Sequence, residues 1–213
     1  MGFESDTKGL LTKEKILETV VYCMVNREAN TEVLEEVPHI RLLDVAGVYL
    51  SLAGLENGCT MGLLVGRETC RHYGIQDGEL EEAARRNTEA MGFTVQDAGE
   101  ALGIQGDRFP ESMYVLTNRE SLYGASIMLY EDYFRRLAER AGTDLYILPA
   151  SIHELIAVPA VNGELAGLQN IVKEINGTEE AISPGEVLSN NVYWYSREGG
   201  LTYAVVTSDT KRR

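Results

Sequence analysis

The residues best suited to chemistry lie in one short stretch, DLYILPASIHELIAVP, which spans residues 144–159. It places Ser151, His153 and Glu154 between two apolar runs, LYIL and LIAV. An imidazole beside a hydroxyl or a carboxylate is a pairing that general acid–base and nucleophilic catalysis use. The stretch therefore raises the hypothesis of a hydrolase or transferase in which His153 acts with Ser151, Glu154 or a cysteine.

The apolar runs restrict how these groups can meet. LYIL and LIAV predict two neighbouring antiparallel strands whose link reverses the chain near Pro149. Adjacent strand residues face opposite ways, so His153 and Glu154 do not line one pocket, whereas Ser151 and His153 share a face. Proline and serine also explain a turn without any ligand. The sequence therefore favours a structural role here and assigns no catalytic residue, with Ser151, His153 and Glu154 as weak candidates.

Cysteine and histidine elsewhere offer a second kind of chemistry. Cys70 and His72 in ETCRHYG are two residues apart, a spacing that occurs in some metal sites. Two soft ligands do not complete a tetrahedral site, and a cysteine nucleophile needs a thiolate-favouring environment that the sequence does not show. We therefore expect no metal and no other cofactor, with Cys70 and His72 as weak candidates for a metal site.

Several common catalytic motifs are missing from the sequence. It contains no Gly-rich phosphate loop ending in Lys-Ser or Lys-Thr, no GxGxxG, no HExxH, no paired CxxC and no GxSxG. No sequence motif therefore supports the usual nucleotide-binding or hydrolase mechanisms.

The composition is that of an acidic globular protein. Of 213 residues, 33 are acidic and 19 basic, which gives a formal charge of −14, while 44% are hydrophobic and can supply a core. Binding to nucleic acid depends on Lys and Arg contacts to phosphates, so direct nucleic-acid binding is not expected. We expect a non-enzymatic protein–protein interaction module, and the charge favours a basic protein partner. An alternative is an acidic inhibitor, encoded by a mobile element, that mimics nucleic acid in a basic channel.

The sequence also bears on the compartment. The start, MGFESDTKGLL, lacks the basic and apolar regions of a signal peptide, and no run approaches the roughly 18 apolar residues of a membrane span. Three cysteines cannot all pair within one chain, so no dense disulfide framework is expected. We therefore expect a cytoplasmic protein without a membrane partner.

The first half of the chain predicts a helix, a hairpin and a second helix. Residues 13–37 place apolar side chains at helical spacing, with Thr12 as a cap and Pro38 as a stop, and predict one amphipathic helix. IRLLDVAGVYLSL and TMGLLVG predict two strands joined by a loop. Residues 77–91 predict a second helix, and the glycine-rich residues 92–110 predict a connector with one weak helical turn.

The second half alternates strands and helices. MYVLT and LYGASIMLY predict strands, and EDYFRRLAERAG predicts a helix that ends at Gly142. After the LYIL and LIAV pair, ELAGLQNIVKEING predicts a helix that ends at Gly177, and NVYWYS with LTYAVV predicts a terminal hairpin.

These elements together predict an α+β fold. Hairpins cannot make the parallel crossovers of a doubly wound fold, so we expect a mostly antiparallel sheet built from successive hairpins with helices packed on one face. The expected division is an N-terminal helix–hairpin–helix lobe (13–91), a connector (92–111) and a C-terminal α+β lobe (112–207), within one compact unit.

Two polar residues lie near the first predicted strand. His39 follows Pro38 where helix gives way to strand, a place where a histidine commonly pins a loop. Asp44 lies within the apolar run RLLDVAGVYL, where a buried carboxylate needs a hydrogen-bonding partner or an arginine. Arg41 is the candidate for that partner, and an exposed strand face is the simpler account.

Aromatic residues alternate along the last strand pair. Tyr193 and Tyr195 are expected to face one way and Trp194 the other. One face belongs to the core, and the other offers a surface for a partner, because Tyr and Trp suit interfaces.

Four segments together resemble a known family. They are REANTEVLEEVPHIRLLDVA, MYVLTNRESLYGASIMLY, DLYILPASIHELIAVP and EVLSNNVYWYSREGG, and with the flanking chain they extend over residues 13–200. The combination of YVLTN, LYGA and LYILPxSIHE is the most specific part. In these segments the chain is similar to the bacterial family called Domain of Unknown Function 5688. Its members usually carry a further N-terminal region, which the resemblance implies is missing here.

The resemblance implies no activity, because none is established for the family. It implies that the family signature includes Asn118, Tyr123, Gly124, Pro149, Ser151, His153 and Glu154. Their cluster is the first place to look for a site. The expected binding residues are Asn118, Tyr123, Tyr193, Trp194 and Tyr195.

Overall fold

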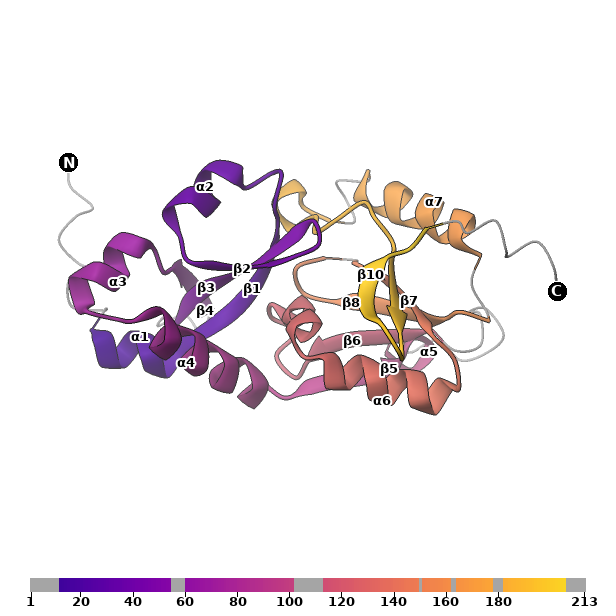
Figure 1. Cartoon of the computed structure of the whole chain (residues 1–213), viewed down its shortest axis with the longest axis horizontal. Helices are drawn as coiled ribbons and strands as arrows, with labels where there is room; N and C mark the ends of the chain where they lie inside the picture. Colours follow the sequence, from indigo (N-terminus) through magenta and orange to yellow (C-terminus); the bar gives the residue numbers. More distant parts are fainter. Residues whose placement is uncertain are drawn as a thin grey trace.

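The structure is a computed structural model and describes residues 12–54, 60–101, 113–149, 151–161, 164–177 and 182–205. These residues form two antiparallel sheets, one from each half of the chain, with helices around them (Figure 1). The expectation of an α+β fold with antiparallel strands in hairpins is confirmed. In the described part of the chain, no helix combines the length and the apolar character needed to cross a bilayer.

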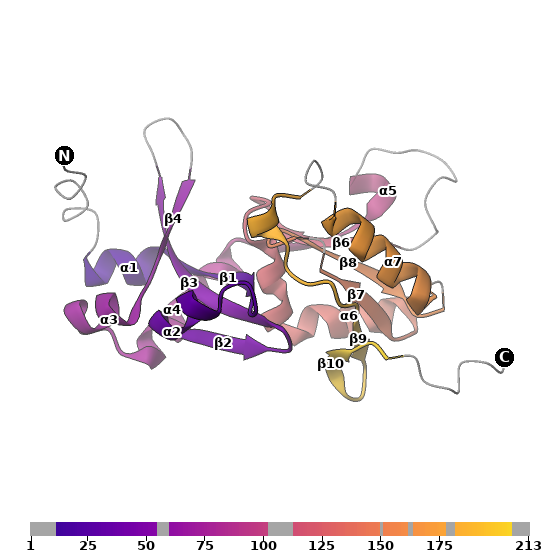
Figure 2. The ribbon, with the colours of Figure 1, turned by 90° about the horizontal axis from the view of Figure 1, so that it is seen from above.

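The N-terminal sheet is arranged around one long strand, β3. Strand β1 pairs with one edge of β3, while β2 and then β4 pair with the other edge. The far half of β3 and its partner β4 extend away from the body of the molecule (Figure 2). The elements of this half are α1 (Lys13–Thr19), β1 (Val20–Asn26), α2 (Thr31–Glu36), β2 (His39–Leu42), β3 (Val45–Gly54), β4 (Thr60–Leu64), α3 (Arg67–Tyr73) and α4 (Asp77–Ala90).

The single helix predicted over residues 13–37 is wrong. Thr12 does cap α1, since its hydroxyl accepts a hydrogen bond from Lys15 N–H at 3.1 Å. The helix then ends, and Val20–Asn26 continues as strand β1. Each of the first five strand residues is buried, because both faces of β1 are covered. When consecutive residues are all apolar, some of them match helical spacing by chance. The many β-branched residues of this run favour a strand.

The C-terminal sheet has six strands in the order β10-β9-β7-β8-β6-β5, all antiparallel. The predicted LYIL and LIAV pair and the terminal hairpin are both confirmed. The elements of this half are β5 (Phe93–Asp97), α5 (Ala98–Ala101), β6 (Tyr114–Asn118), η2 (Gly124–Leu129), α6 (Glu131–Ala141), β7 (Leu145–Leu148), β8 (Leu155–Pro159), α7 (Leu165–Asn176), η3 (Pro184–Glu186), β9 (Tyr193–Ser196) and β10 (Gly200–Tyr203).

Two segments of this half differ from the sequence prediction. The glycine-rich connector contains β5, which forms an edge of the sheet beside β6. LYGASIMLY is not a strand, because Gly124–Leu129 forms the 3₁₀ helix η2. Its first three residues are small and buried, which lets η2 pack closely between β1 and β6. The apolar run was therefore a buried helical turn, a case that periodicity alone cannot distinguish from a strand.

Helices cover both faces of each sheet rather than one. Figure 1 shows α4 and α6 along one side of the molecule and α2 and α7 along the other. On β7, Leu145 and Ile147 pack with α6, whereas Leu148 packs with α7. Because strand residues alternate between faces, these contacts require helices on opposite sides.

One hydrophobic core continues from one sheet into the other. Met24 and Val45 of the N-terminal sheet belong to the same buried cluster as Ile127 of η2 and Ile147 and Leu155 of the C-terminal sheet. The segment around η2 therefore joins the two sheets.

Candidate functional site

Ser151 and Glu154 serve the backbone of the link between β7 and β8. Ser151 N–H donates to Glu154 O at 3.1 Å, and Ser151 Oγ accepts a hydrogen bond from His153 N–H at 3.0 Å. The side chain of Glu154 is exposed. The hydroxyl of Ser151 is thus committed to the turn, as an ST-turn hydroxyl commonly is.

His153 is held by the segment before η2. Tyr123 N–H donates to its Nδ1 at 3.1 Å, and the Tyr123 ring stacks on the imidazole with centroids 5.6 Å apart. A backbone N–H can only donate, so Nδ1 carries no proton and Nε2 carries it. Nε2 lies 3.6 Å from a carboxylate oxygen of Glu186. The imidazole therefore works as an acceptor that fixes the backbone of Tyr123.

Asn118 closes the turn that leads to Tyr123. It is 2% exposed, its Nδ2 donates to Leu122 O at 2.7 Å, and its Oδ1 accepts hydrogen bonds from Glu120 N–H and Leu122 N–H. The turn contains two non-glycine residues with positive φ, Ser121 at 50° and Tyr123 at 56°. The three hydrogen bonds of the buried Asn118 amide stabilise this strained backbone.

Gly124 completes the contact between these segments. A Cβ at this position would overlap His153 O and Thr117 Oγ1, and Thr117 Oγ1 itself donates to His153 O at 2.9 Å. The structure thus brings Asn118, Tyr123, Gly124, Ser151 and His153, which the sequence resemblance singled out, together with Thr117 at one place. We call this place the signature junction: Thr117, Asn118, Tyr123, Gly124, Ser151 and His153.

The cysteine and histidine proposed as metal ligands do not face one another. Cys70 is buried in the core below α3, where desolvation raises the pKa of its thiol, while His72 is exposed and packs edge-on against Tyr73. Burial also raises the pKa of the Cys23 thiol to about 12. Cys59 lies outside the described residues. Among the described residues, no three His, Cys, Asp or Glu side chains gather as metal ligands would.

The aromatic residues of β9 divide as alternation requires. Tyr193 and Tyr195 are buried in the core, and Trp194 packs edge-on against Tyr146 on the opposite face. The Tyr193 hydroxyl donates to Asp44 Oδ1 at 2.7 Å. Asp44 also accepts hydrogen bonds from Ser189 and Asn191, so its partners come from the other half of the chain and do not include Arg41.

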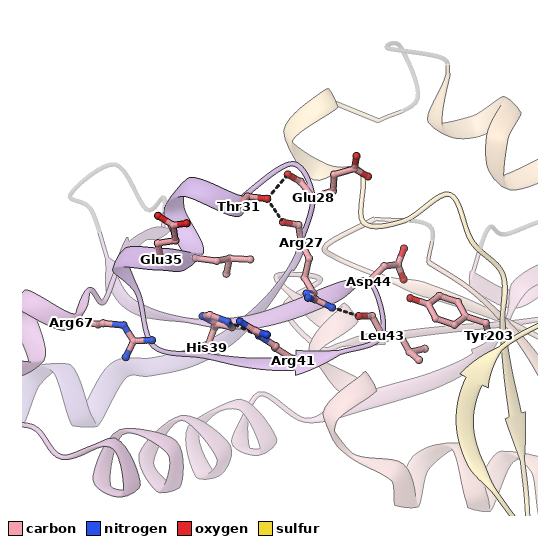
Figure 3. Close-up of a pocket in the computed structure, with 11 residues that line it drawn as sticks. Arg27, Glu28, Thr31, Glu35, His39, Arg41, Leu43, Asp44, Arg67 and Tyr203 are labelled. Atoms are coloured by element: carbon pink, nitrogen blue, oxygen red, sulfur yellow. Dashed lines mark hydrogen bonds between the residues drawn. The ribbon is translucent and has the colours of Figure 1, made fainter.

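A cavity of about 560 Å³ lies between α2, β2 and the turn at residues 43–44 (Figure 3). Arg27, Arg41 and Arg67 line it, from the end of β1, from β2 and from the start of α3. Leu34 of α2 and Tyr203 of β10 also contribute to the walls. We call this cavity the arginine groove.

No ion pair neutralises these arginines in the described part of the chain. Figure 3 shows the heads of Arg27 and Arg41 close together over β2, with the carboxylates of Glu28 and Glu35 turned away from them. Arg27 donates to Leu43 O at 2.7 Å. Unpaired guanidinium groups that share one cavity are suited to bind a carboxylate or another anion.

His39 lies beside Arg41 in the same groove. Its Nδ1 is 3.1 Å from Val37 O, and Arg41 Nε donates to its Nε2 at 3.3 Å. A carbonyl oxygen only accepts and a guanidinium only donates, so the proton of the neutral ring is on Nδ1. His39 therefore supports Arg41 and leaves its terminal nitrogens available.

Sequence reasoning did not assign Arg27 and Arg67 to a site. They are 40 positions apart in the sequence. The pairing of β1 and β2 with β3 brings Arg27 near Arg41, while Arg67 follows β4, which also pairs with β3. One signal was readable, since His39 and Arg41 are two residues apart and share a face of any strand that contains both.

The fold defines the chain as an α+β protein of two antiparallel sheets. The model of one family, described as Family of unknown function (DUF5688), matches residues 2–197, and the chain belongs to this family. The resemblance found in the sequence is thereby confirmed. No curated protein and no solved structure matches the chain.

Proposed function

We propose that this chain is a non-enzymatic protein-binding module whose arginine groove receives acidic side chains of a partner protein. The observation that carries the proposal is the convergence of three arginines on one cavity without an ion pair among the described residues. The chain has 33 acidic and 19 basic residues, so carboxylates were abundantly available as partners.

Guanidinium groups suit this role because their planar donors match a carboxylate in two parallel hydrogen bonds. The total charge of −14 favours a basic partner over most of the surface. The groove is lined by three arginines together with Glu28, Glu35 and Asp44, and the Asp44 carboxylate already accepts hydrogen bonds from the other half of the chain. The guanidinium groups without an ion pair attract a carboxylate of the partner at this place, which adds specificity to the contact.

The state of the candidate catalytic groups supports a binding role over an enzymatic one. In the signature junction, His153 Nδ1 and Ser151 Oγ both accept hydrogen bonds from backbone N–H groups. The thiols of Cys23 and Cys70 are buried with raised pKa values, which disfavours the nucleophilic thiolate. None of these groups is arranged as a nucleophile beside a base.

The test is affinity purification from the native host with quantitative mass spectrometry. The groove variant is Arg41→Gln with Arg67→Gln, since both side chains are exposed. The matched control is Arg86→Gln with Arg136→Gln, which removes the same charge from two other exposed arginines without an ion pair in the described part of the chain.

The expected result is a stoichiometric protein partner that the wild type and the control retain and that the groove variant binds about 10-fold more weakly or not at all. Equal recovery by groove variant and control would contradict the proposal. Recovery of the chain with a bound metabolite and no protein would point to an enzyme or a small-molecule carrier instead.

A further inference from the structure

Strand β2 is an open edge of the N-terminal sheet. It pairs with β3 on one side, and no strand among the described residues pairs with its other side. Such an edge presents unpaired N–H and C=O groups and is a template for an added strand. The side chains of β2 alternate, so His39 and Arg41 face the arginine groove while Ile40 and Leu42 face the opposite side.

A second cavity of about 270 Å³ lies on that opposite side. Ile40 and Leu42 form part of its wall, and Leu129 of η2, Phe134 of α6 and Leu201 of β10 form much of the rest. We call it the apolar cavity. Arg41 borders both cavities, which places them on the two faces of the same edge strand.

We propose that β2 accepts an extended segment of the partner protein as an added strand, in which acidic and apolar side chains alternate. The proposal rests on the proposed function, because the acidic side chains occupy the arginine groove. The intervening apolar side chains enter the apolar cavity. Strand addition in general takes its affinity from main-chain hydrogen bonds and its specificity from pockets for alternate side chains.

The chemistry of the two cavities selects this occupant over the obvious competitors. A second copy of the chain that paired through its own β2 would bring His39–Leu42, which contains Arg41 and no acidic residue, against the same groove. Like charges would then oppose each other across the new pair. A purely acidic segment would place charged groups in the apolar cavity, which costs desolvation free energy.

The test measures binding of a fluorescein-labelled peptide of about eight residues, in which glutamate and valine alternate, to the full chain by fluorescence anisotropy. Two N-methylated versions carry methyl groups either on all valine amides or on all glutamate amides. In a strand the amides of alternate residues point to opposite edges, so each version blocks one edge. Peptides with lysine for glutamate and with serine for valine test the two cavities separately.

Strand addition predicts that one methylation pattern abolishes binding and the other leaves it within about 2-fold of the parent peptide. The lysine peptide is expected to bind about 10-fold more weakly or worse, and the serine peptide about 5-fold more weakly. Amides of β2 are expected to gain protection from hydrogen exchange on binding of the parent peptide.

The outcomes separate this inference from the proposed function. Equal binding of both methylated peptides, with loss in the Arg41→Gln and Arg67→Gln variant, would overturn strand addition and leave the groove as an anion site. Binding that survives in that variant would overturn the role of the groove. Absence of binding by any peptide of the set at millimolar concentration, or self-association of the chain through β2 in sedimentation, would overturn the inference.

Discussion

The signature junction and the arginine groove lie on the same small core but differ in how their polar groups are satisfied. That core, which we call the shared core, consists of Cys23, Leu34, Val37, Ala46 and Val48. Leu34 lines the groove, and Tyr123 of the junction packs against the shared core. Each region contains one histidine whose ring accepts a hydrogen bond, from Arg41 Nε in the groove and from Tyr123 N–H in the junction.

The difference lies in what remains unpaired. In the junction, Asn118 and Thr117 are hydrogen-bonded within the chain and His153 accepts a backbone N–H. In the groove, the guanidinium groups of Arg41 and Arg67 have no carboxylate partner among the described residues. Satisfied buried groups stabilise a fold, whereas exposed unpaired cations are available to a partner. The hydrogen bonds of the junction within the chain are those that a structural joint requires.

The largest expected effect concerns the thiol in the shared core. Burial raises the pKa of Cys23 to about 12, so we expect its alkylation by iodoacetamide at pH 7.5 to be on the order of 1,000-fold slower than in the unfolded chain. The stability from this thiol is complete below its ordinary pKa and is lost as the pH rises toward about 12, because the unfolded thiol ionises first.

The measurement is mass spectrometry of labelled Cys23 in a Cys59→Ser chain, with the same chain in concentrated urea as the reference. Labelling of Cys23 in the native chain at the reference rate would show that the shared core opens readily. The junction and the groove would then not rest on a common rigid core.

The next largest effect is expected at Gly124 in the junction. Gly124→Ala places a methyl group against His153 O and Thr117 Oγ1, so one of the two segments must move. We expect a loss of about 3 kcal/mol in the free energy of unfolding, measured by urea denaturation followed by circular dichroism. The control is Gly78→Ala, because a Cβ there meets no atom within 4 Å. Equal stability of the two variants would show that the junction is loosely packed.

A smaller effect is expected from His153. His153→Ala removes the acceptor of Tyr123 N–H and the ring that stacks on Tyr123, so the free energy of unfolding should fall by about 1–2 kcal/mol. Binding of a partner in the arginine groove should persist. The control is His72→Ala on the exposed face of α3.

Loss of the cellular function with unchanged stability would reverse this interpretation. His153 would then act in chemistry or in binding, as the hydrolase or transferase hypothesis requires. The signature junction would then be a functional site and not a structural joint.

Much of the fold followed from local patterns. Helix α6 ends at Gly142, whose φ of 70° suits a left-handed cap, and a charged helix with one apolar stripe is readable from periodicity. Two of the errors, at 20–26 and 124–129, concern apolar runs. In each, the surroundings decide the structure: β1 is covered on both faces, and η2 fits between two sheets. No local pattern contains that information.

The two regions also differed in how well the sequence located them. The junction was marked by distinctive turn residues, and the antiparallel pairing of β7 and β8 was correctly predicted around it. The groove was not marked, because Arg27 and Arg67 come near Arg41 only through the pairing of β1, β2 and β4 with β3. The misassigned helix over 13–37 also hid the strand that ends at Asn26, one residue before Arg27.

The smallest stability effect is expected from the groove itself. Arg41→Gln with Arg67→Gln removes exposed side chains that have no ion pair among the described residues, so the free energy of unfolding should change by less than about 0.5 kcal/mol. Arg27→Gln is the contrasting variant, because it loses the hydrogen bond that Arg27 donates to Leu43 O. Leu43 itself has a positive φ of 54°. We expect this substitution to cost about 1 kcal/mol.

Urea denaturation of both variants tests whether the groove arginines, unlike the polar residues of the junction, contribute little to the free energy of unfolding. A small change for the double variant together with loss of partner binding means that the two arginines contribute to recognition and hardly to folding. A loss of about 2 kcal/mol or more would mean that these arginines stabilise the fold as His153 does, since surface substitutions away from structural contacts rarely cost so much. The groove would then be a second structural joint. The arginines would not be free to bind an acidic segment beside the open edge of β2.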